Sequence, residues 1–333
     1  MRREILSLVT LLITTSASAQ YQPDILGEGF EQCTLSLEPD YSGEICATLI
    51  RRAPLVDSSR AVLYIHGYND YFFQREMAER FTDSLYNFYA LDLRKYGRSH
   101  REGQNLFEVR EMSEYFEDID SAISQMRSEG MEQIILMAHS TGGLTTSLYC
   151  NANRNNPKVD AMILNSPFLD MNLGGFTENI LLPIVSMIGK FFPDLVVFCD
   201  PTSAYYESLD RDHKGEWKYD TTLKLKSMNP TTAGWLRAIH RGQKELQRGL
   251  NIDQPILLMY SDKSTKSPVW TPEYQCSDAV LDVKDIAYYG ERLGSDITHA
   301  QIEDGMHDLI LSGYEARESV YNTIFEWLKK RGL

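Results

Sequence analysis

The segment Ala138-His-Ser-Thr-Gly-Gly143 places a serine between small residues two positions before it and two positions after it. This composition is typical of a nucleophile elbow, a sharp turn between a strand and a helix that exposes a serine hydroxyl. Ser140 would be the nucleophile, and Ala138 and Gly142 would keep the tight turn free of clashes. The strict pattern has glycine where this chain has Ala138, a departure of one methyl group. The segment predicts nucleophilic attack on an acyl carbonyl.

A serine nucleophile requires a general base that removes its proton. In chains with this elbow the catalytic residues follow the order serine, acid, histidine, so the base must come after Ser140. His307 stands in the loop Glu303–Asp308, just beyond the last expected strand, where it can reach Ser140. The other histidines after Ser140 fall in an insertion or within a strand: His213, His240 and His299. The sequence therefore predicts His307 as the base.

Donors for the developing oxyanion are expected at the end of an earlier strand. His66-Gly67-Tyr68 follows the apolar run 61–65, where an oxyanion loop belongs in this kind of architecture. The backbone N–H groups of Tyr68 and Thr141 could then converge on the negative charge. His66 is a base by its chemistry, but it precedes the serine and lies on this loop, so we interpret it as structural.

The acid of the triad has three candidates in the sequence. Asp262 follows the strand-like run 255–260 and is the simplest choice. Asp278 and Asp282 come later, after the loop 263–276. From their positions along the chain, all three aspartates remain candidates for the acid.

The elements that must position these residues are visible as alternating patterns. Short apolar runs of the kind that form buried strands occur at 61–65, 86–93, 133–138, 159–165, 255–260 and 297–302. Stretches with helical patterns lie between and after them, at 73–84, 112–126, 144–151, 284–293 and 314–330. Strands and helices that alternate in this way predict an α/β fold, a mostly parallel sheet with helices on both faces.

A different kind of sequence interrupts this alternation at 167–250, with several prolines, glycines and aromatic residues. We interpret it as a mostly helical cap over the carboxyl edge of the sheet, where open α/β sheets bind ligands. The core then comprises residues 20–166 and 251–333. Within the cap, 179–192 is strongly apolar, which fits either an ordinary packed lid helix or a wall for an acyl chain.

The five cysteines suggest disulfides, because residues 1–19 resemble an export signal and disulfides persist in an oxidising compartment. Cys33 and Cys46 lie in two strand-like segments joined by the turn-rich stretch 38–43, which predicts a hairpin and a disulfide across it. Cys199 with Cys276 is a second expected pair, and the pairing of Cys150 is left open. No two cysteines have the spacing of zinc ligands, so no metal is expected.

Residues 1–19 have the pattern of a secretory signal peptide: a basic start, an apolar run over 6–15 and small residues at Ala17-Ser-Ala19. We therefore expect a periplasmic or secreted protein. The apolar run is too short to span a bilayer comfortably, so no integral membrane span is expected in the mature chain.

The amino-acid composition of the chain limits the kinds of partner that it can bind. The chain has 43% hydrophobic residues, enough for a sizeable core, and 47 acidic against 33 basic residues give a formal charge of -14. Such a surface repels phosphate backbones, so a nucleic-acid partner is not expected.

Several segments together carry a resemblance to a known family. They are His66-Gly67, Leu91–Ser99, His139–Gly143, Asp278–Asp282 and Gly305–His307, and they occur in the family order over nearly all of the mature chain. On them, the chain resembles the α/β-hydrolases of the monoglyceride lipase and lysophospholipase branch, also described as serine aminopeptidase-like. The catalytic aspartate of that family opens an Asp-x-x-x-Asp stretch, so the resemblance implies Asp278 rather than Asp262 as the acid.

The resemblance implies a serine hydrolase of carboxylic esters, most similar to a lysophospholipase or monoacylglycerol lipase, and the signal-peptide pattern indicates that it is secreted. A mechanism that uses serine, acid and histidine needs no cofactor. Its partner would be a small-molecule or lipid ester, with transient lipid contact through the cap. One alternative is a serine aminopeptidase of the same fold, which needs cap carboxylates for a substrate amine; Asp210, Asp212 and Glu216 are available. Another is a non-catalytic binding module, which would have no need to keep serine, acid and histidine together.

Overall fold

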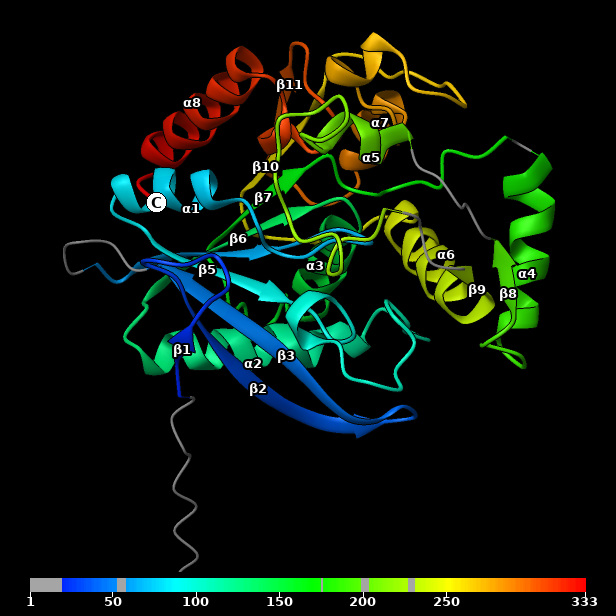
Figure 1. The fold of residues 1–333 in the computed structure, drawn as a ribbon, viewed down its shortest axis with the longest axis horizontal. Helices are drawn as coiled ribbons and strands as arrows, with labels where there is room; N and C mark the ends of the chain where they lie inside the picture. The colour runs from blue at the N-terminus through cyan, green and yellow to red at the C-terminus, as the bar shows by residue number, and fades with distance from the viewer. Residues whose placement is uncertain (1–19, 53–57, 175, 199–203, 227–230) are drawn as a thin grey trace, which may run out of the picture.

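The computed structural model describes residues 20–333 apart from 53–57, 175, 199–203 and 227–230. Within these residues, a sheet of nine strands runs through the molecule (Figure 1). In spatial order the strands are β1 (Gln22–Pro23), β2 (Glu31–Asp40), β3 (Gly43–Arg52), β5 (Asn87–Asp92), β4 (Arg60–Ile65), β6 (Gln133–His139), β7 (Ala161–Asn165), β10 (Ile256–Ser261) and β11 (Ile297–Ile302). From β5 to β11 neighbouring strands are parallel, and β1, β2 and β3 form an antiparallel edge.

Helices cover both faces of the sheet. One face packs against α2 (Glu114–Ser128), α3 (Thr141–Ala152), α6 (Ala233–Gln247) and α7 (Val283–Gly290). The other packs against α1 (Arg75–Asp83) and α8 (Tyr314–Arg331). In α2, Ile119, Ile123 and Met126 recur at helical spacing and are buried, so one side of that helix faces the sheet. The mostly parallel sheet with helices on both faces is confirmed.

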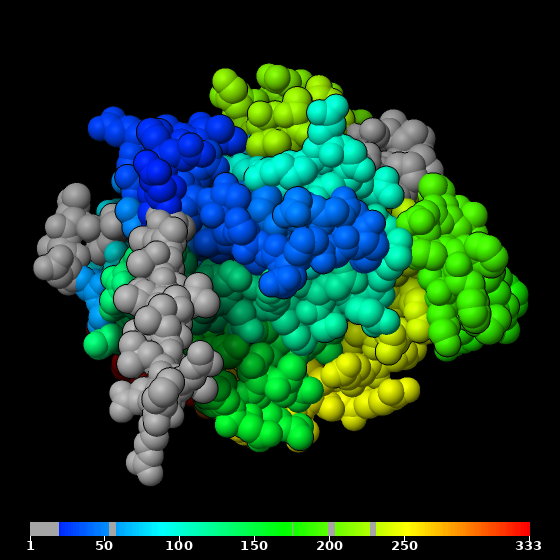
Figure 2. All heavy atoms as spheres, turned by 90° about the horizontal axis from the view of Figure 1, so that it is seen from below, coloured from blue at the N-terminus to red at the C-terminus, as the bar shows by residue number. Residues whose placement is uncertain are grey.

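The chain between β7 and β10 leaves the sheet and returns to it, and we call residues 167–250 the cap segment. Its described elements are a π-helical turn (Thr177–Leu181), α4 (Leu182–Gly189), β8 (Val196–Phe198), α5 (Ala204–Leu209), β9 (Thr231–Thr232) and α6. Figure 1 shows α4, β8 and α6 beyond the arrowheads of the central strands, and the green α4 projects at the same side in Figure 2. The cap segment therefore lies at the carboxyl edge of the sheet. Short 3₁₀ turns occur elsewhere, at Gly97–Ser99, Pro272–Gln275 and Leu309–Leu311.

The predicted hairpin forms from β2 and β3, but the predicted disulfide between Cys33 and Cys46 is wrong. Cys33 stands opposite Leu49, and Cys46 stands opposite Ser36. This offset of three residues puts the two side chains on opposite faces of the sheet, because strand side chains alternate. Both cysteines are free buried thiols. The second predicted pair involves Cys199, which lies outside the described residues.

We expect Cys33 and Cys46 to be alkylated without a reductant once the chain is unfolded, and to be protected in the native protein. The two residues are 1% and 7% exposed, and burial raises the pKa of the Cys33 thiol to about 11, so little reactive thiolate is available in the fold. Mass-spectrometric mapping of peptides alkylated before and after denaturation measures this. Recovery of the two peptides joined to each other would contradict the strand register.

Candidate active site

Ser140 stands at the turn between β6 and α3, with backbone angles of φ 51° and ψ -118°. A positive φ is strained for serine, because it crowds the Cβ atom against the backbone. Gly142 lets the turn close on the end of β4: a Cβ atom there would lie 2.7 Å from the carbonyl oxygen of Ile65 and closer still to that of His66. Ala138 is fully buried, so its methyl group fits where the strict pattern has glycine.

Replacing Gly142 by Ala is expected to lower kcat by about 100-fold, because the added methyl group meets backbone carbonyls and must push α3 away from the turn that follows β4. Kinetics with a p-nitrophenyl ester measure the loss. Gly313→Ala is the matched control, since a Cβ atom there would meet nothing within 4 Å. Unchanged kcat in Gly142→Ala would show that the elbow tolerates the displacement.

The structure brings Ser140, His307 and Asp278 together in one hydrogen-bonded chain. His307 Nδ1 lies 2.9 Å from Asp278 Oδ2, and His307 Nε2 lies 3.1 Å from Ser140 Oγ. Since the carboxylate accepts the proton on Nδ1, Nε2 carries the lone pair and accepts the hydroxyl proton of Ser140. All three residues are buried. The arrangement has the geometry of a nucleophile, a base and an orienting acid.

Of the three carboxyl groups left open by spacing, Asp278 alone contacts His307. Its second oxygen accepts the backbone N–H groups of Val280 and Leu281, both at 2.8 Å, which holds the side chain in place. Asp262 instead accepts the N–H of Asp304 at 3.0 Å. Asp282 caps the start of α7 by accepting the N–H of Lys284 at 2.9 Å.

The residues proposed for the oxyanion hole lie on either side of Ser140. Thr141 opens α3, and the first N–H groups of a helix have no acceptor within it. Gly67 approaches the elbow so closely that a Cβ atom there would lie 3.1 Å from Ser140 Cβ, and Tyr68 follows it along the rim of the same cavity. The two backbone segments therefore flank the hydroxyl.

His66 fixes the turn that follows β4 and carries Gly67 and Tyr68. Its Nε2 accepts the N–H of Leu93 at 3.1 Å, so its Nδ1 carries the proton and donates to the carbonyl oxygen of Gly67 at 2.7 Å. Both ring nitrogens are thus engaged in fixing backbone. The other histidines set aside from the sequence are partnered elsewhere or lie outside the cavity: His213 beside Asp210, His299 beside Glu291, and His240 in α6.

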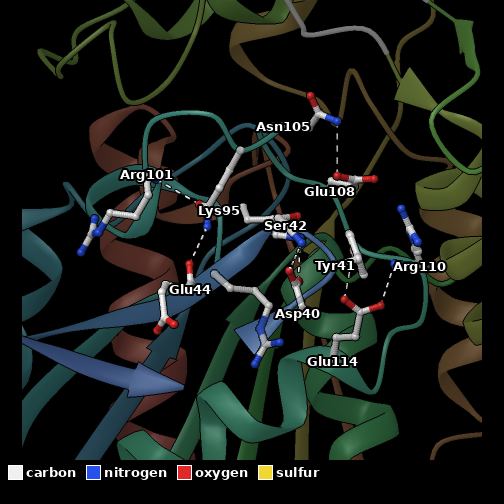
Figure 3. A network of polar contacts seen from close by, with 12 residues as sticks. Asp40, Tyr41, Ser42, Glu44, Lys95, Arg101, Asn105, Glu108, Arg110 and Glu114 are labelled. Atoms are coloured by element: carbon white, nitrogen blue, oxygen red, sulfur yellow. Dashed lines mark hydrogen bonds and ion pairs between the residues drawn. The ribbon is translucent and has the colours of Figure 1, made fainter. Parts of the chain in front are cut away.

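A polar network ties the β2–β3 hairpin to the loop 93–113 and to the cap segment (Figure 3). The fully buried Lys95 donates from Nζ to Asp40 at 2.8 Å. The ring of Tyr41 lies between two cations, with Lys95 Nζ 4.1 Å and Arg110 Cζ 3.6 Å from its centre. Arg110 also pairs with Asp194 of the cap segment at 3.5 Å.

Through Phe107, this network also contacts the turn after β4 that carries Tyr68. The N–H of Phe107 donates to the carbonyl oxygen of Lys95 at 3.1 Å, and the Phe107 ring packs on Tyr68 with centres 5.0 Å apart. Beside it, burial and the neighbouring Asp194 carboxylate raise the pKa of Glu108. The loop 93–113 therefore links the hairpin, the cap segment and the turn that carries Tyr68.

A cavity of about 530 Å³ opens onto Ser140 and His307. Most of its wall is apolar and comes from the cap segment, including Leu182, Val185 and Trp235. Of the apolar stretch 179–192, Leu181, Leu182 and Val185 line the cavity, whereas Ile184 is 45% exposed on the outer side of α4. An ester placed with its carbonyl at Ser140 would have an apolar wall beside it.

Sequence reasoning missed the polar end of this cavity, formed by Asp70, Lys224 and Tyr205. Asp70 stands four positions after His66, so its place just after the expected oxyanion loop could have singled it out. Lys224 lies in the described stretch 211–226, which forms no helix or strand, and nothing in its local sequence marks it.

Known proteins resemble most of the chain. A family model described as serine aminopeptidase, S33, matches residues 57–313. No curated protein sequence matches the chain.

Solved structures of similar fold include two enzymes of the branch suspected from the sequence. A soluble variant of monoglyceride lipase from Saccharomyces cerevisiae, solved with a substrate analog, is 14% identical with a TM-score of 0.64, covering 89% of this chain and 95% of that one. The monoacylglycerol lipase of Paleococcus ferrophilus is 19% identical with a TM-score of 0.62, covering 84% and 98%. A thermostable carboxyl esterase from Bacillus coagulans is 13% identical with a TM-score of 0.60, covering 90% and 98%. At these identities the likeness concerns the fold.

Proposed function

The chain belongs to the serine aminopeptidase S33 family and has the α/β-hydrolase fold, and from this premise we propose that it is a serine hydrolase of carboxylic esters. The observation that carries the proposal is the hydrogen-bonded chain from Asp278 through His307 to Ser140 beside a largely apolar cavity. A family of hydrolases, a strained serine and an oriented base support the same chemistry.

The reaction follows from the geometry. His307 Nε2 takes the proton of Ser140 Oγ as that oxygen attacks the ester carbonyl, and Asp278 stabilises the imidazolium that forms. The N–H groups of Tyr68 and Thr141 stabilise the oxyanion. His307 then protonates the leaving alcohol, and water attacks the acyl-enzyme with His307 again as base. Each step uses side chains and backbone of this chain.

The substrate class is drawn from the cavity. Its apolar wall suits an acyl chain, so we take a lysophospholipid or a monoacylglycerol as the model substrate. The enzymes of similar fold named monoglyceride and monoacylglycerol lipase agree with this choice.

If the wall holds an acyl chain, kcat/KM is expected to rise about fourfold per methylene from acetyl toward medium-chain p-nitrophenyl esters, because each buried CH₂ contributes about 0.8 kcal/mol. Val185→Asp should flatten this rise, since Val185 lines the cavity. Met187→Asp is the control on the same helix, because Met187 is 60% exposed and is not part of the wall. Fastest turnover of acetate, with the same profile in both variants, would mean a short-chain esterase.

A serine aminopeptidase is the alternative that the family description raises, and the cavity disfavours it. The cap carboxylates considered from the sequence, Asp210, Asp212 and Glu216, are not among the described residues that line the cavity. Asp70 does line it, but its carboxylate is bonded to Lys224 at 2.8 Å. A non-catalytic binding module is disfavoured by the complete Ser140, His307 and Asp278 arrangement.

Secretion and lipid contact complete the proposal. The signal-peptide pattern lies at 1–19, outside the described residues, and we propose on that pattern a periplasmic or secreted enzyme. The helices of the described part are all too short or too polar to cross a membrane. The outer side of α4 and the residues around it expose Ile180, Ile184, Met187, Phe191 and Phe192, a surface suited to transient contact with lipid. N-terminal sequencing of the mature protein from periplasm and medium tests the location.

A further inference from the structure

The cavity is apolar along the cap segment but has a charged pair at its polar end. Lys224 Nζ donates to Asp70 Oδ1 at 2.8 Å, and both residues line the cavity with Ser140 and His307. Asp70 is 2% exposed, and the Lys224 side chain is 12% exposed. Among the described residues, Lys224 is the one lysine or arginine of the lining.

The surroundings of this pair are acidic. A carboxylate oxygen of Asp70, one of Asp308 and a ring nitrogen of His139 lie within 4.8 Å of one another, and all three residues are buried. Burial lowers the pKa of His139, so its ring carries no positive charge at neutral pH to offset the two carboxylates. Lys224 therefore supplies the positive charge at this end of the cavity.

The position of Lys224 is set by backbone contacts next to it. The Asn69 side chain donates to the carbonyl oxygen of Leu225 at 3.0 Å and accepts the N–H of Leu225 at 2.9 Å. The N–H of Asp220 donates to the hydroxyl of Tyr71 at 2.8 Å. Because the chain is held on both sides of Lys224, the ammonium group is fixed beside Asp70.

We propose that Lys224 determines specificity by occupying, with its own ammonium group, the place that a substrate amine would take beside Asp70. The cavity then hydrolyses neutral esters and rejects esters that carry a positive charge, because a second cation would have to be buried against Lys224. Removal of Lys224 exposes Asp70 and creates an amine-binding end in the same cavity. This inference rests on the proposed ester hydrolysis.

The test compares esters that differ by one charge and hardly in shape. One pair is the p-nitrophenyl ester of heptanoic acid and that of 6-aminohexanoic acid, which differ by methyl against ammonium at the chain end. The other pair is 3,3-dimethylbutyl butyrate and butyrylcholine, with the charge on the alcohol. We expect one of these two pairs to place its charge at the polar end of the cavity, beside Lys224. For that pair, the wild-type kcat/KM for the neutral ester should be about 100-fold higher than that for the charged ester.

Lys224→Met should reduce that ratio by about tenfold or more, since Asp70 is then free to pair with the substrate cation. Lys226→Met is the matched control, because Lys226 is an exposed lysine of the same stretch outside the cavity lining, and its ratio should equal that of wild type. Lys224→Met/Asp70→Asn should restore the preference for the neutral ester, because Asp70 is the one carboxylate among the described lining residues. Asp308 lies near Asp70 but is not among the lining residues, and it accepts a hydrogen bond from Asn165.

Three results would overturn the inference: no preference for neutral esters in wild type, an unchanged ratio in Lys224→Met, or a double variant that keeps the gain toward cationic esters. The last would mean that Lys224→Met merely enlarges the cavity. Each variant's rate with the neutral ester reports whether the site is still assembled. If wild type hydrolyses no neutral ester, the proposed function itself fails, an outcome distinct from an unchanged ratio.

Discussion

Replacement of Ser140 by Ala is expected to lower kcat for ester hydrolysis by about 10⁵-fold or more, because the acyl-enzyme cannot form without the hydroxyl. The fold should be unaffected or slightly stabilised, since the side chain has its hydrogen bond to His307 alone among the described contacts. Hydrolysis of a p-nitrophenyl ester measures the rate. Ser124→Ala, at an exposed serine on α2, is the control and should match wild type.

Covalent labelling gives the same prediction an independent measurement. A fluorophosphonate should modify Ser140 in the folded protein, and peptide mapping should find the adduct on Ser140 and on no other serine. Labelling at a different serine, or full activity in Ser140→Ala, would exclude the proposed nucleophile.

Replacement of Asp278 by Asn is expected to lower kcat by about 10⁴-fold, because an amide no longer holds His307 in the tautomer that accepts the serine proton. The variant should stay folded, because Asn retains an oxygen that can accept the N–H groups of Val280 and Leu281. Steady-state kinetics together with thermal unfolding separate a catalytic loss from a structural one.

Asp262→Asn and Asp282→Asn are the matched controls for this prediction. Asp262 contacts the backbone of Asp304, and Asp282 caps α7, so each should change stability more than kcat. If Asp262→Asn lost more activity than Asp278→Asn, the orienting acid would have been misassigned.

Local signals in the sequence predicted the features that depend on a few neighbouring residues. The elbow at Ser140 follows from small residues at fixed positions around it, and the parallel strands follow from apolar runs such as 133–138. The acid could not be chosen from such local signals, because its identity depends on the path of the loop after β10. In the structure Ser264 and Asp278 form an isolated bridge, which directs Asp278 toward His307. The family motif pointed to Asp278 although the path of this loop could not be predicted from the sequence.

Features that depend on register or on distant segments were beyond local signals. The spacing of Cys33 and Cys46 was compatible with a disulfide, but a register offset of three residues separates their side chains. The apolar stretch of α4 was recognised, yet its helical phase, which turns Val185 inward and Ile184 outward, was not. The pair of Asp70 and Lys224 joins segments 154 positions apart, and although the position of Asp70 after His66 could have singled out that residue, no local pattern predicts its pairing with Lys224.

The entry and exit of the cap segment have an evolutionary consequence. The cap segment leaves the sheet after β7 and returns at β10, and these strands are direct neighbours, with Met162 opposite Ile256. An insertion with both ends on adjacent strands can change in length or be replaced while the sheet keeps its register. Ser140, Asp278 and His307 all lie outside it, whereas Lys224 and most of the apolar wall lie within it. Selection can therefore alter which substrate is accepted by exchanging one continuous stretch of the gene, while the catalytic residues are inherited unchanged.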